Sequence, residues 1–335
     1  MTWQNQLIIW YQNNKRHLPF RETNDPYKIW VSEIMLQQTT VTAVVDYYKR
    51  FIERFPDVET LAEAELQEVY KYWEGLGYYR RAKNLHLSAK QIVTNGQFPD
   101  TYEDLLTLTG VGPYTAAAIM AFAYHQSYGA VDGNVLRVIA RLKAIKSNIM
   151  DHVTVKHITS IVNEDISGYD PSAFNQGLMD FANAICTPRN PKCDECPIRE
   201  SCTAYQQHLE NVLPIRIKKV KRTESSFITG IITYEDSLML VQNSAGLLEN
   251  LYGLIQFEVD SPYSFIEQFK EAYGVDLIID CFLDDYKHVF THKTWYMHAY
   301  HFIVNTPDHL PLYSREDIKK LPIPTAHLKI IKNHY

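Results

Sequence analysis

The chemistry that this sequence could perform is concentrated first in its cysteines. Four of the five cysteines lie in one short stretch, CTPRNPKCDECPIRESC, with the spacing Cys186-x6-Cys193-x2-Cys196-x5-Cys202. Structural zinc sites commonly use two short Cys or His pairs, whereas four thiolates in one loop suit a [4Fe–4S] cube with one ligand for each corner iron. The spacing therefore predicts one [4Fe–4S] cluster, and zinc is the alternative. Cys281 lies far along the chain and is expected to be buried or incidental.

A glutamate in an apolar segment is a second candidate for chemistry. Glu33 lies in IWVSEIMLQQ, and its neighbours three and four residues away are mostly apolar. If this helix face is buried, desolvation raises the pKa of Glu33 and keeps the side chain protonated near neutral pH, which makes it a candidate general acid. A glutamate that turns toward solvent is the alternative interpretation of the same pattern.

An aspartate in AVDGNVLR could be the partner of that acid. Asp132 precedes a helical pattern, where aspartate is a preferred N-cap, and capping alone would explain an isolated aspartate. An anion held at a helix N-terminus could also stabilise the oxocarbenium-like sugar that forms when a glycosidic bond breaks. One protonated and one ionised carboxylate would form the pair that glycosidic cleavage uses.

The segment LTGVGPYT joins two helical patterns through Gly110 and Gly112. Glycine has no side chain to keep a phosphate away from the backbone N–H groups, and the dipole of the following helix favours an anion. The segment therefore predicts a helix–hairpin–helix at about residues 105–124 that grips one DNA strand. A simple helix connector is the alternative for the turn alone, but the cysteine loop that follows favours DNA binding.

The elements that must position these residues change character along the chain. The chain has 335 residues, a length that suggests more than one domain. Residues 1–213 show helical periodicity interrupted by proline and glycine. A basic linker is expected at residues 214–225, where Ile215–Arg222 reads IRIKKVKR. Residues 226–335 predict a smaller α+β domain.

Within that second domain, strands are expected in FITGIITYE and LMLVQN, which a turn-like Asp-Ser separates. Further strands are expected at about Leu277–Phe282 and Trp295–Val304, with a helix near Phe265–Tyr273.

The start of the chain and its charge bear on location and partners. MTWQNQLIIWYQNN lacks the cationic start, long apolar run and cleavage site of a signal peptide. The longest mostly apolar stretch, Thr115–Tyr124, is too short to span a bilayer. The chain is therefore expected to be cytoplasmic, of bacterial type and nucleoid-associated, with no membrane partner. The formal net charge of −6 does not favour nucleic acid, but DNA binding needs only one positive face.

Four segments together resemble the MutY-type adenine DNA glycosylases of the endonuclease III superfamily: DPYKIWVSEIMLQQTTV, WEGLGYYRRAKNLH, LTGVGPYTAAAI and VDGNVLRV. With the cysteine loop, the resemblance covers nearly all of residues 1–210. It implies a multidomain fold: an all-α, two-lobed helix–hairpin–helix glycosylase body with a [4Fe–4S] loop at 186–202, and a C-terminal α+β Nudix-like domain. The loop would present Lys192, Arg189 and Arg199 to DNA.

The resemblance also implies roles at the reacting centre. Glu33 would protonate adenine at N7, Asp132 would stabilise the sugar cation, and Tyr114 would support the reaction. Bifunctional relatives have a Schiff-base lysine at the position of Tyr114, so excision without efficient strand cleavage is expected. Arg21 would line the adenine pocket, although a surface cation is the alternative.

Other residues would contact the DNA or the lesion. Gln38 and Tyr78 would wedge into the base stack that the adenine leaves, although Tyr78 could instead be a packed aromatic. The turn from Phe290 through Thr291 to His292 would sense 8-oxoguanine opposite the adenine. The family more often has serine where this chain has Thr291, so the hydroxyl is kept and a methyl is added.

The expected function is removal of adenine mispaired with 8-oxoguanine or guanine in double-stranded DNA, by base flipping and acid-assisted hydrolysis that leaves an abasic site. The enzyme is expected to act as a monomer. The alternatives are an oxidised-pyrimidine glycosylase, a catalytically inactive iron–sulfur DNA-binding protein, and a nucleotide pyrophosphatase in the second domain. The last is disfavoured because Val259, Gln268 and Ala272 occupy positions that are acidic in the Nudix catalytic box.

Overall fold

In the computed structural model the chain divides into two compact units. One consists of Met1–Glu63 and Lys83–Lys218, and the other of Ala64–Ala82 and Lys219–Tyr335. The second unit therefore contains a short segment from the middle of the helical sequence, which the sequence did not lead us to expect. The structure describes residues 1–217, 223–307 and 309–335, so residues 218–222 of the predicted basic linker lie outside the described residues.

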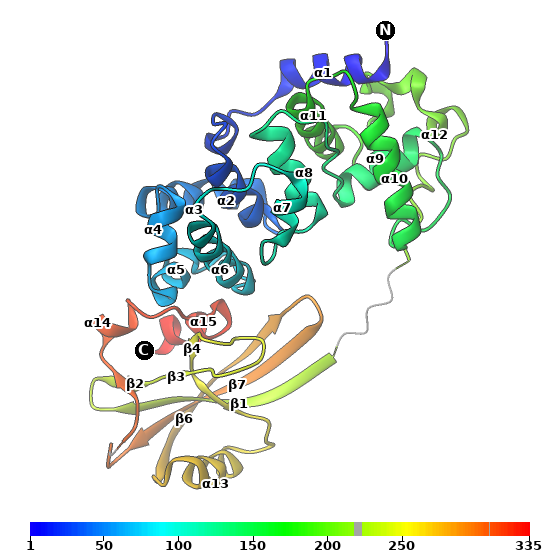
Figure 1. The fold of residues 1–335 in the computed structure, drawn as a ribbon. Helices are drawn as coiled ribbons and strands as arrows, with labels where there is room; N and C mark the ends of the chain where they lie inside the picture. The colour runs from blue at the N-terminus through cyan, green and yellow to red at the C-terminus, as the bar shows by residue number, and fades with distance from the viewer. Residues whose placement is uncertain (218–222, 308) are drawn as a thin grey trace. The chain divides into compact units, whose positions relative to one another are not determined.

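The regular secondary structure in the described part of the first unit is all helical, as predicted (Figure 1). The α-helices that lie wholly within it are α1 (Trp3–Asn14), α2 (Pro26–Leu36), α3 (Val41–Arg54), α4 (Val58–Glu63), α7 (Tyr102–Thr107), α8 (Pro113–Phe122), α9 (Gly133–Leu142), α10 (His152–Asp165), α11 (Pro171–Ala184) and α12 (Thr203–Gln206). Helix α6 (Arg80–Asn95) begins in the second unit and continues in the first. No helix in the described part of the chain combines the length and the apolar character that crossing a membrane would require.

The start of the chain packs against a helix far along the sequence. The ring centroids of Trp3 on α1 and Phe174 on α11 are 5.7 Å apart. The Tyr11 hydroxyl donates a hydrogen bond of 2.7 Å to the Gln176 side chain, also on α11. These contacts join α1 to the lobe that contains α9 and α10, and Figure 1 shows the four helices together.

The periodic apolar pattern from Ile29 to Phe55 is divided between two helices. Helix α2 ends at Leu36 and α3 begins at Val41. In the turn between them Gln38 has a φ of 58°, a left-handed conformation that is uncommon for residues other than glycine. Apolar spacing alone does not reveal such a break, because both helices keep the same period.

The second unit contains a mixed sheet with helices on its faces. Its elements are α5 (Leu66–Trp73), β1 (Thr223–Tyr234), β2 (Ser237–Met239), β3 (Val241–Gln242), β4 (Tyr252–Gly253), β5 (Ile255–Phe257), α13 (Pro262–Tyr273), β6 (Leu277–Val289), β7 (Lys293–Val304), β8 (Leu312–Tyr313), α14 (Arg315–Ile318) and α15 (Thr325–His334). The strand order is β6-β7-β1-β2-β8, with β5 also paired to β1 and a separate β3–β4 pair. Strands β1 and β7 are parallel, whereas β6 and β7 are antiparallel.

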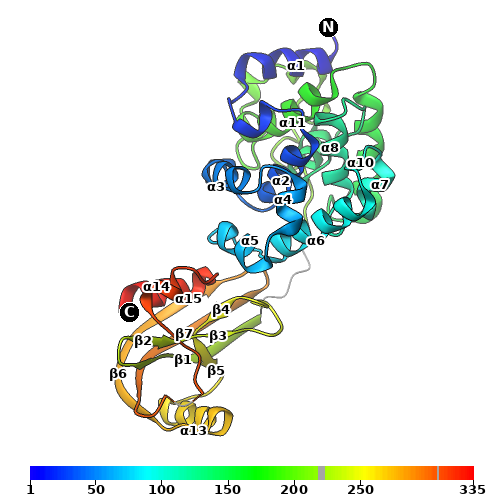
Figure 2. The ribbon, with the colours of Figure 1, turned by 60° about the vertical axis from the view of Figure 1, so that its left-hand side comes forward.

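Alternate residues of the sheet face two different apolar layers. Ile231 and Met297 pack with α14 and α15, whereas Ile232 and Phe302 pack with α13. Figure 2 shows α13 on one side of the strands and α15 on the other. This two-layer burial confirms the predicted α+β domain and explains why β1 is apolar at consecutive positions.

Cys281 was expected to be buried or incidental, and its side chain is exposed on β6, so the buried alternative is wrong. Strand β6 is the outermost strand in the sheet order, so one side of it has no neighbouring strand among the described residues. An apolar-looking cysteine in a strand pattern does not indicate whether that strand lies at an edge.

Candidate active site and iron–sulfur loop

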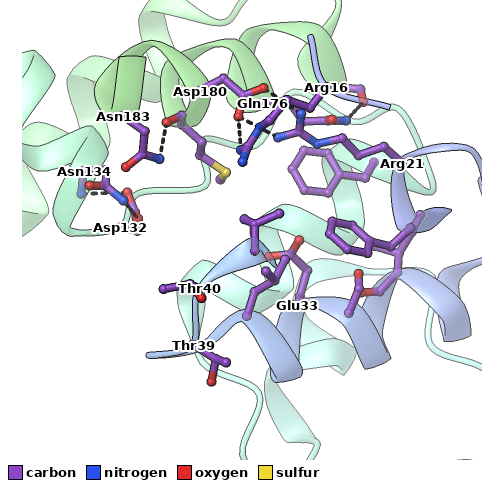
Figure 3. A pocket seen from close by; sticks show the side chains of 18 of the residues that line it. Arg16, Arg21, Glu33, Thr39, Thr40, Asp132, Asn134, Gln176, Asp180 and Asn183 are labelled. Carbon is purple, nitrogen blue, oxygen red and sulfur yellow. Dashed lines mark hydrogen bonds and ion pairs between the residues drawn. The ribbon is translucent and has the colours of Figure 1, made fainter. Parts of the chain in front are cut away.

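A cavity of about 400 Å³ in the helical unit brings the predicted catalytic residues together. Glu33 comes from α2, Tyr114 from α8 and Asp132 from the residue before α9, and all three line this cavity. Arg21 also lines it, from the short 3-10 helix Pro19–Arg21. Figure 3 shows Glu33, Asp132 and Arg21 on separate elements around the cavity.

Glu33 is buried, with 6% of its surface exposed, so the solvent-facing alternative is wrong. Burial raises the pKa of Glu33 to about 7. The hydrogen bond from Tyr114 and the positive charge of Arg21 lower this pKa, whereas the charge of Asp132 raises it further. A carboxyl group with such a pKa holds its proton for much of the time at neutral pH, as a general acid must.

Tyr114 donates its hydroxyl proton to Glu33 Oε2 over 2.9 Å. Burial, with the added charge of Glu33, raises the pKa of Tyr114 well above its ordinary value, so the phenol stays neutral and acts as a donor. Its hydroxyl also lies 3.8 Å from the sulfur of Met179 on α11. A phenol offers no amine, so this position cannot form a Schiff base.

Asp132 is the N-cap of α9, as one interpretation of the sequence predicted, and it also lines the cavity. Its Oδ1 accepts the backbone N–H groups of Asn134 at 2.9 Å and Val135 at 2.8 Å. Its Oδ2 accepts the Asn134 side-chain amide at 2.8 Å. Capping therefore fixes the carboxylate in place, and the helix N-terminus favours its negative charge, so the two interpretations are compatible.

Arg21 is an ion-paired residue with only 14% of its side chain exposed, rather than a surface cation. Its two terminal nitrogens donate to the carboxylate of Asp180 on α11, at 2.6 and 3.1 Å. Arg16 donates to the same carboxylate at 2.6 Å. Although burial by itself raises the pKa of Asp180, the hydrogen bonds and charges of Arg21 and Arg16 hold it below its ordinary value.

Helix α11 also contributes to this cavity, although none of its residues was predicted to be part of the site. Gln176, Asp180 and Asn183 all line it (Figure 3). They are spaced by four and three residues, so they share one face of a helix that is otherwise largely apolar and buried. A polar stripe at helical spacing in an otherwise apolar segment was the signal that could have found them.

The predicted hairpin is formed by the end of α7, the turn and the start of α8. Gly110 in this turn has a φ of 83°, and a Cβ there would lie 2.8 Å from Cβ of Asn84, so both the conformation and the packing require glycine. A second cavity, of about 570 Å³, reaches from Gly110 and Gly112 past the exposed Gln38 to Glu33. The hairpin and the catalytic candidates thus share one continuous surface.

The structure also brings together two predicted residues of the second unit. The hydroxyl groups of Tyr78 and Thr291 are 2.7 Å apart. Tyr78 is 46% exposed and has a φ of 51°, so it is not a packed aromatic. Thr291 and His292 are exposed in the turn between β6 and β7.

The four clustered cysteines line one small cavity of about 30 Å³. Arg141 on α9 donates to the sulfur of Cys186 at 3.3 Å and to the carbonyl oxygen of Thr187 at 2.7 Å. Burial raises the pKa of Cys196 to about 12, and the charges of the other three cysteines contribute to the rise. Four thiolates can therefore coexist here only around cations, which an iron–sulfur cluster supplies.

Three parts of the chain match known protein families. Residues 31–164 match the HhH-GPD superfamily of base excision DNA repair proteins. Residues 186–202 match the iron–sulfur binding domain of endonuclease III, and residues 228–333 match the NUDIX domain. The predicted fold classes are confirmed, and the cysteine loop holds one [4Fe–4S] cluster.

Solved structures agree on the helical part of the fold. A thermostable thymine-DNA glycosylase is 30% identical, covers 61% of this chain and 95% of its own, and superposes with a TM-score of 0.57. Endonuclease III in a non-covalent DNA complex is 20% identical, covers 63% of this chain and 100% of its own, and has a TM-score of 0.53. At 20% identity, the similarity to endonuclease III shows only that the two proteins share a fold.

Curated relatives are similar over a larger part of the chain. The adenine DNA glycosylase of Buchnera aphidicola subsp. Schizaphis graminum is 34% identical over 271 residues, which are 79% of this chain and 78% of the relative. That of Buchnera aphidicola subsp. Baizongia pistaciae is 33% identical over 307 residues, 89% and 85% of the two chains. The mouse enzyme is 41% identical over 217 residues, but this chain spans only 42% of its length. This chain therefore belongs to the adenine DNA glycosylase family, hydrolases that act on N-glycosyl bonds in DNA.

Proposed function

We propose that this enzyme removes adenine that is mispaired with 8-oxoguanine or guanine, by flipping it out of the duplex and hydrolysing its N-glycosidic bond. The observation that carries the proposal is the buried Glu33, hydrogen-bonded by Tyr114, in the cavity that Asp132 also lines. A base inside a duplex cannot reach a buried carboxyl group, so the adenine must leave the stack.

In the proposed mechanism Glu33 donates its proton to N7 of the extruded adenine. Protonation makes the base a better leaving group, and the bond between the base nitrogen and C1′ breaks with both electrons passing to the base. The sugar becomes oxocarbenium-like, and the fixed carboxylate of Asp132 stabilises its positive charge. Water then attacks C1′ and loses a proton, which leaves an abasic site.

Tyr114 and Arg21 would position the acid in this mechanism. The hydroxyl of Tyr114 holds one oxygen of Glu33, which leaves the other oxygen to carry the proton toward the base. Arg21 lines the same cavity, and its bidentate pair with Asp180 keeps its guanidinium from rotating freely. Because Tyr114 stands where a lysine would be needed for a covalent intermediate, we propose hydrolysis without efficient strand cleavage.

The proposed DNA contacts use the remaining predicted residues. Gly110 and Gly112 would let backbone N–H groups of the hairpin approach a phosphate. Gln38 and Tyr78, both exposed on a left-handed backbone, would fill the space that the adenine leaves. Thr291 would sense the altered edge of 8-oxoguanine through its hydroxyl group.

His292, the neighbour of Thr291 in the same turn, would contact the lesion-bearing strand from its exposed position. We propose that the second unit acts as a lesion-binding module. Three positions that are acidic in the Nudix catalytic box hold Val259, Gln268 and Ala272 in this chain. Glu271, which fits the box, lies on the exposed side of α13. A magnesium-dependent pyrophosphatase would lack its carboxylate ligands there.

Cys186, Cys193, Cys196 and Cys202 would hold the cluster. It would tie four points of the loop together and so present nearby cations to the DNA backbone. Arg189 and Arg199 are candidates for that contact, together with Lys192, which is about half exposed. This is a structural contribution, since the cysteine cavity and the catalytic cavity have no lining residue in common among the described residues.

The decisive experiment is a single-turnover incubation with a labelled duplex that carries adenine opposite 8-oxoguanine, divided into samples with and without hot alkali. A break that appears mainly after alkali is expected, because the abasic site is alkali-labile. A duplex with adenine opposite thymine is the control and should stay intact. Absence of cleavage in both samples, with cluster-loaded protein that binds the duplex, would contradict the proposal.

A further inference from the structure

A group of three possible metal ligands lies on the second unit, away from the residues used above. Ligand atoms of Asp280, Cys281 and His301 all lie within 4.8 Å of one another. His301 Nδ1 is 2.9 Å from Asp280 Oδ2, and Cys281 Sγ is 3.5 Å from the same oxygen. We propose that these three side chains bind a zinc ion.

A β-bulge is what brings the three side chains together. Successive side chains of a regular strand point to opposite faces, so Asp280 and Cys281 would ordinarily diverge. The pairing of β6 with β7 steps from Ile279↔Phe302 to Cys281↔His301, so Asp280 is the extra residue of the bulge. The bulge redirects its carboxylate toward His301, the residue that lies opposite Cys281.

The observed spacing suits a single tetrahedral ion. Zinc bond lengths of about 2.1 Å to nitrogen or oxygen and about 2.3 Å to sulfur place neighbouring ligand atoms about 3.4 to 3.6 Å apart. The observed 2.9 and 3.5 Å differ from these separations by about half an ångström or less. Side-chain rotation can make such an adjustment. The third pair, Cys281 Sγ and the ligand nitrogen of His301, lies within 4.8 Å, so the sulfur has to approach the imidazole by at most about 1.2 Å.

The surroundings of His301 also suit a metal ligand. Its Nε2 lies 2.8 Å from Oγ1 of Thr233 on β1. A histidine that binds a metal through one nitrogen typically donates its other N–H to an oxygen, which fixes the orientation of the ring. With zinc on Nδ1, the proton of the neutral ring would lie on Nε2 and be donated to Thr233, while the thiol of Cys281 would release its proton to solvent.

The donor set selects the kind of ion. One sulfur, one nitrogen and one carboxylate oxygen are ligands for zinc or a similar transition metal, whereas magnesium and calcium prefer oxygen alone. The Asp280 and His301 side chains are 49% and 25% exposed, so water can take the fourth position. The ion would bridge the edge strand β6 and its neighbour β7.

The same sheet contains a matched pair that lacks the thiol. His298 Nδ1 lies 2.6 Å from Asp285 Oδ1, and His298 Nε2 lies 3.1 Å from Oγ of Ser226. His298 and His301 are three residues apart on one strand, so they face opposite sides of the sheet. Asp285, His298 and Ser226 provide the same carboxylate, imidazole and hydroxyl groups as Asp280, His301 and Thr233, but without a cysteine. They are therefore a control for the contribution of Cys281 to zinc binding.

The first test needs no variant. Full-length protein with its cluster loaded is treated anaerobically with a thiol-alkylating reagent, with and without Zn²⁺, and modification of Cys281 is followed by peptide mass spectrometry. Zinc should slow alkylation at least about tenfold, because a metal-bound thiolate is no longer free to react. An unchanged alkylation rate at saturating zinc would overturn the proposal.

The second test compares variants by equilibrium dialysis against Zn²⁺, with zinc and iron counted in each sample. Full iron content keeps the loop cysteines occupied, so bound zinc must lie elsewhere. Loss of a residue that only supports a metal ligand lowers metal affinity roughly tenfold or more. Cys281→Ser and His301→Asn each remove a direct ligand, so their zinc affinity should fall by at least that factor. Asp285→Asn should bind zinc as the parent does. Equal binding by all four proteins would overturn the site.

Discussion

The helical unit and the sheet of the second unit both place carboxylates beside hydrogen-bonding side chains, but at very different depths. In the helical unit Glu33 is 6% exposed and accepts a hydrogen bond from the hydroxyl group of Tyr114. On the sheet, the carboxylates of Asp280 and Asp285 are 49% and 67% exposed and each contacts a histidine. The contact distances are similar in the two regions, at 2.9 Å for Glu33 and at 2.9 and 2.6 Å for Asp280 and Asp285.

The difference teaches what burial adds to the same functional groups. Around Glu33 the loss of water raises the pKa to about 7, so a carboxyl group becomes an acid at neutral pH. On the sheet, the hydrogen bond from His301 holds the pKa of the exposed Asp280 below its ordinary value. Buried groups in the first region can therefore transfer protons, whereas exposed groups in the second are suited to binding.

The largest expected effect comes from the buried acid itself. We expect Glu33→Gln to lower single-turnover excision of adenine about 10²- to 10⁴-fold, the range that general acids contribute. Duplex binding, measured by gel shift, should stay close to that of the parent. Glu53→Gln, which changes an exposed glutamate on α3, is the matched control and should keep full activity. Retained turnover in Glu33→Gln would contradict the proposal that the buried Glu33 is the general acid.

The next largest effect separates charge from capping. Asparagine can accept the same two backbone N–H groups, so Asp132→Asn should keep α9 intact while removing the negative charge. We expect excision to fall about 10²- to 10³-fold, as when a stabilising group for a developing charge is lost. Asp170→Asn changes the equivalent N-cap of α11 and is the control for capping. Equal losses in both variants would mean that Asp132 only caps its helix.

A pH profile tests the raised pKa directly. Glu33 acts in its protonated form, and its pKa of about 7 means that it loses that form as pH rises through neutrality. The single-turnover rate should therefore be level on the acidic side and fall about tenfold for each pH unit well above 7. Gel shifts across the same range show whether DNA binding changes. A rate that rises with pH would assign Glu33 as a base instead.

The same pKa predicts a stability difference that depends on pH. The pKa of Glu33 rises from 4.5 to about 7 on folding, so the folded state binds this proton more tightly than the unfolded chain does. The stability that this proton contributes is fully present below about pH 4.5 and is lost as pH rises through 7. Compared with the free energy of unfolding of the parent, that of Glu33→Gln should therefore increase by up to about 3 kcal/mol from acidic to alkaline pH. Melting temperatures of both proteins at two pH values measure this, and a gap that does not widen would contradict the raised pKa.

The smallest expected effect lies in the exposed region. Thr291→Val removes one hydroxyl but keeps the shape, and it also breaks the contact with Tyr78. The loss of one hydrogen bond corresponds to about 0.5 to 1.5 kcal/mol, so the preference for 8-oxoguanine over guanine should fall roughly two- to tenfold. Thr291→Ser keeps the hydroxyl and should retain the preference. If valine and serine behave alike, the hydroxyl has no part in lesion sensing.

Much of this molecule could be predicted from the sequence because short-range patterns determine it. The cysteine spacing predicted an iron–sulfur loop, which comparison confirms, and apolar periodicity predicted the helical body and the α+β domain. The glycine that the hairpin requires was visible as Gly110, because only glycine adopts its φ of 83° easily. These features depend on residues within one turn or one loop, so the sequence contains them directly.

The tertiary structure alone decided which polar residues are buried and which distant residues meet. The sequence left Glu33 either buried or exposed, and packing against other helices settled the question. The pair of Arg21 with Asp180 joins residues about 160 positions apart, and the exposure of Cys281 depends on which strand forms the sheet edge. Local patterns cannot fix such facts, because desolvation and long-range contacts depend on every element that packs around a residue.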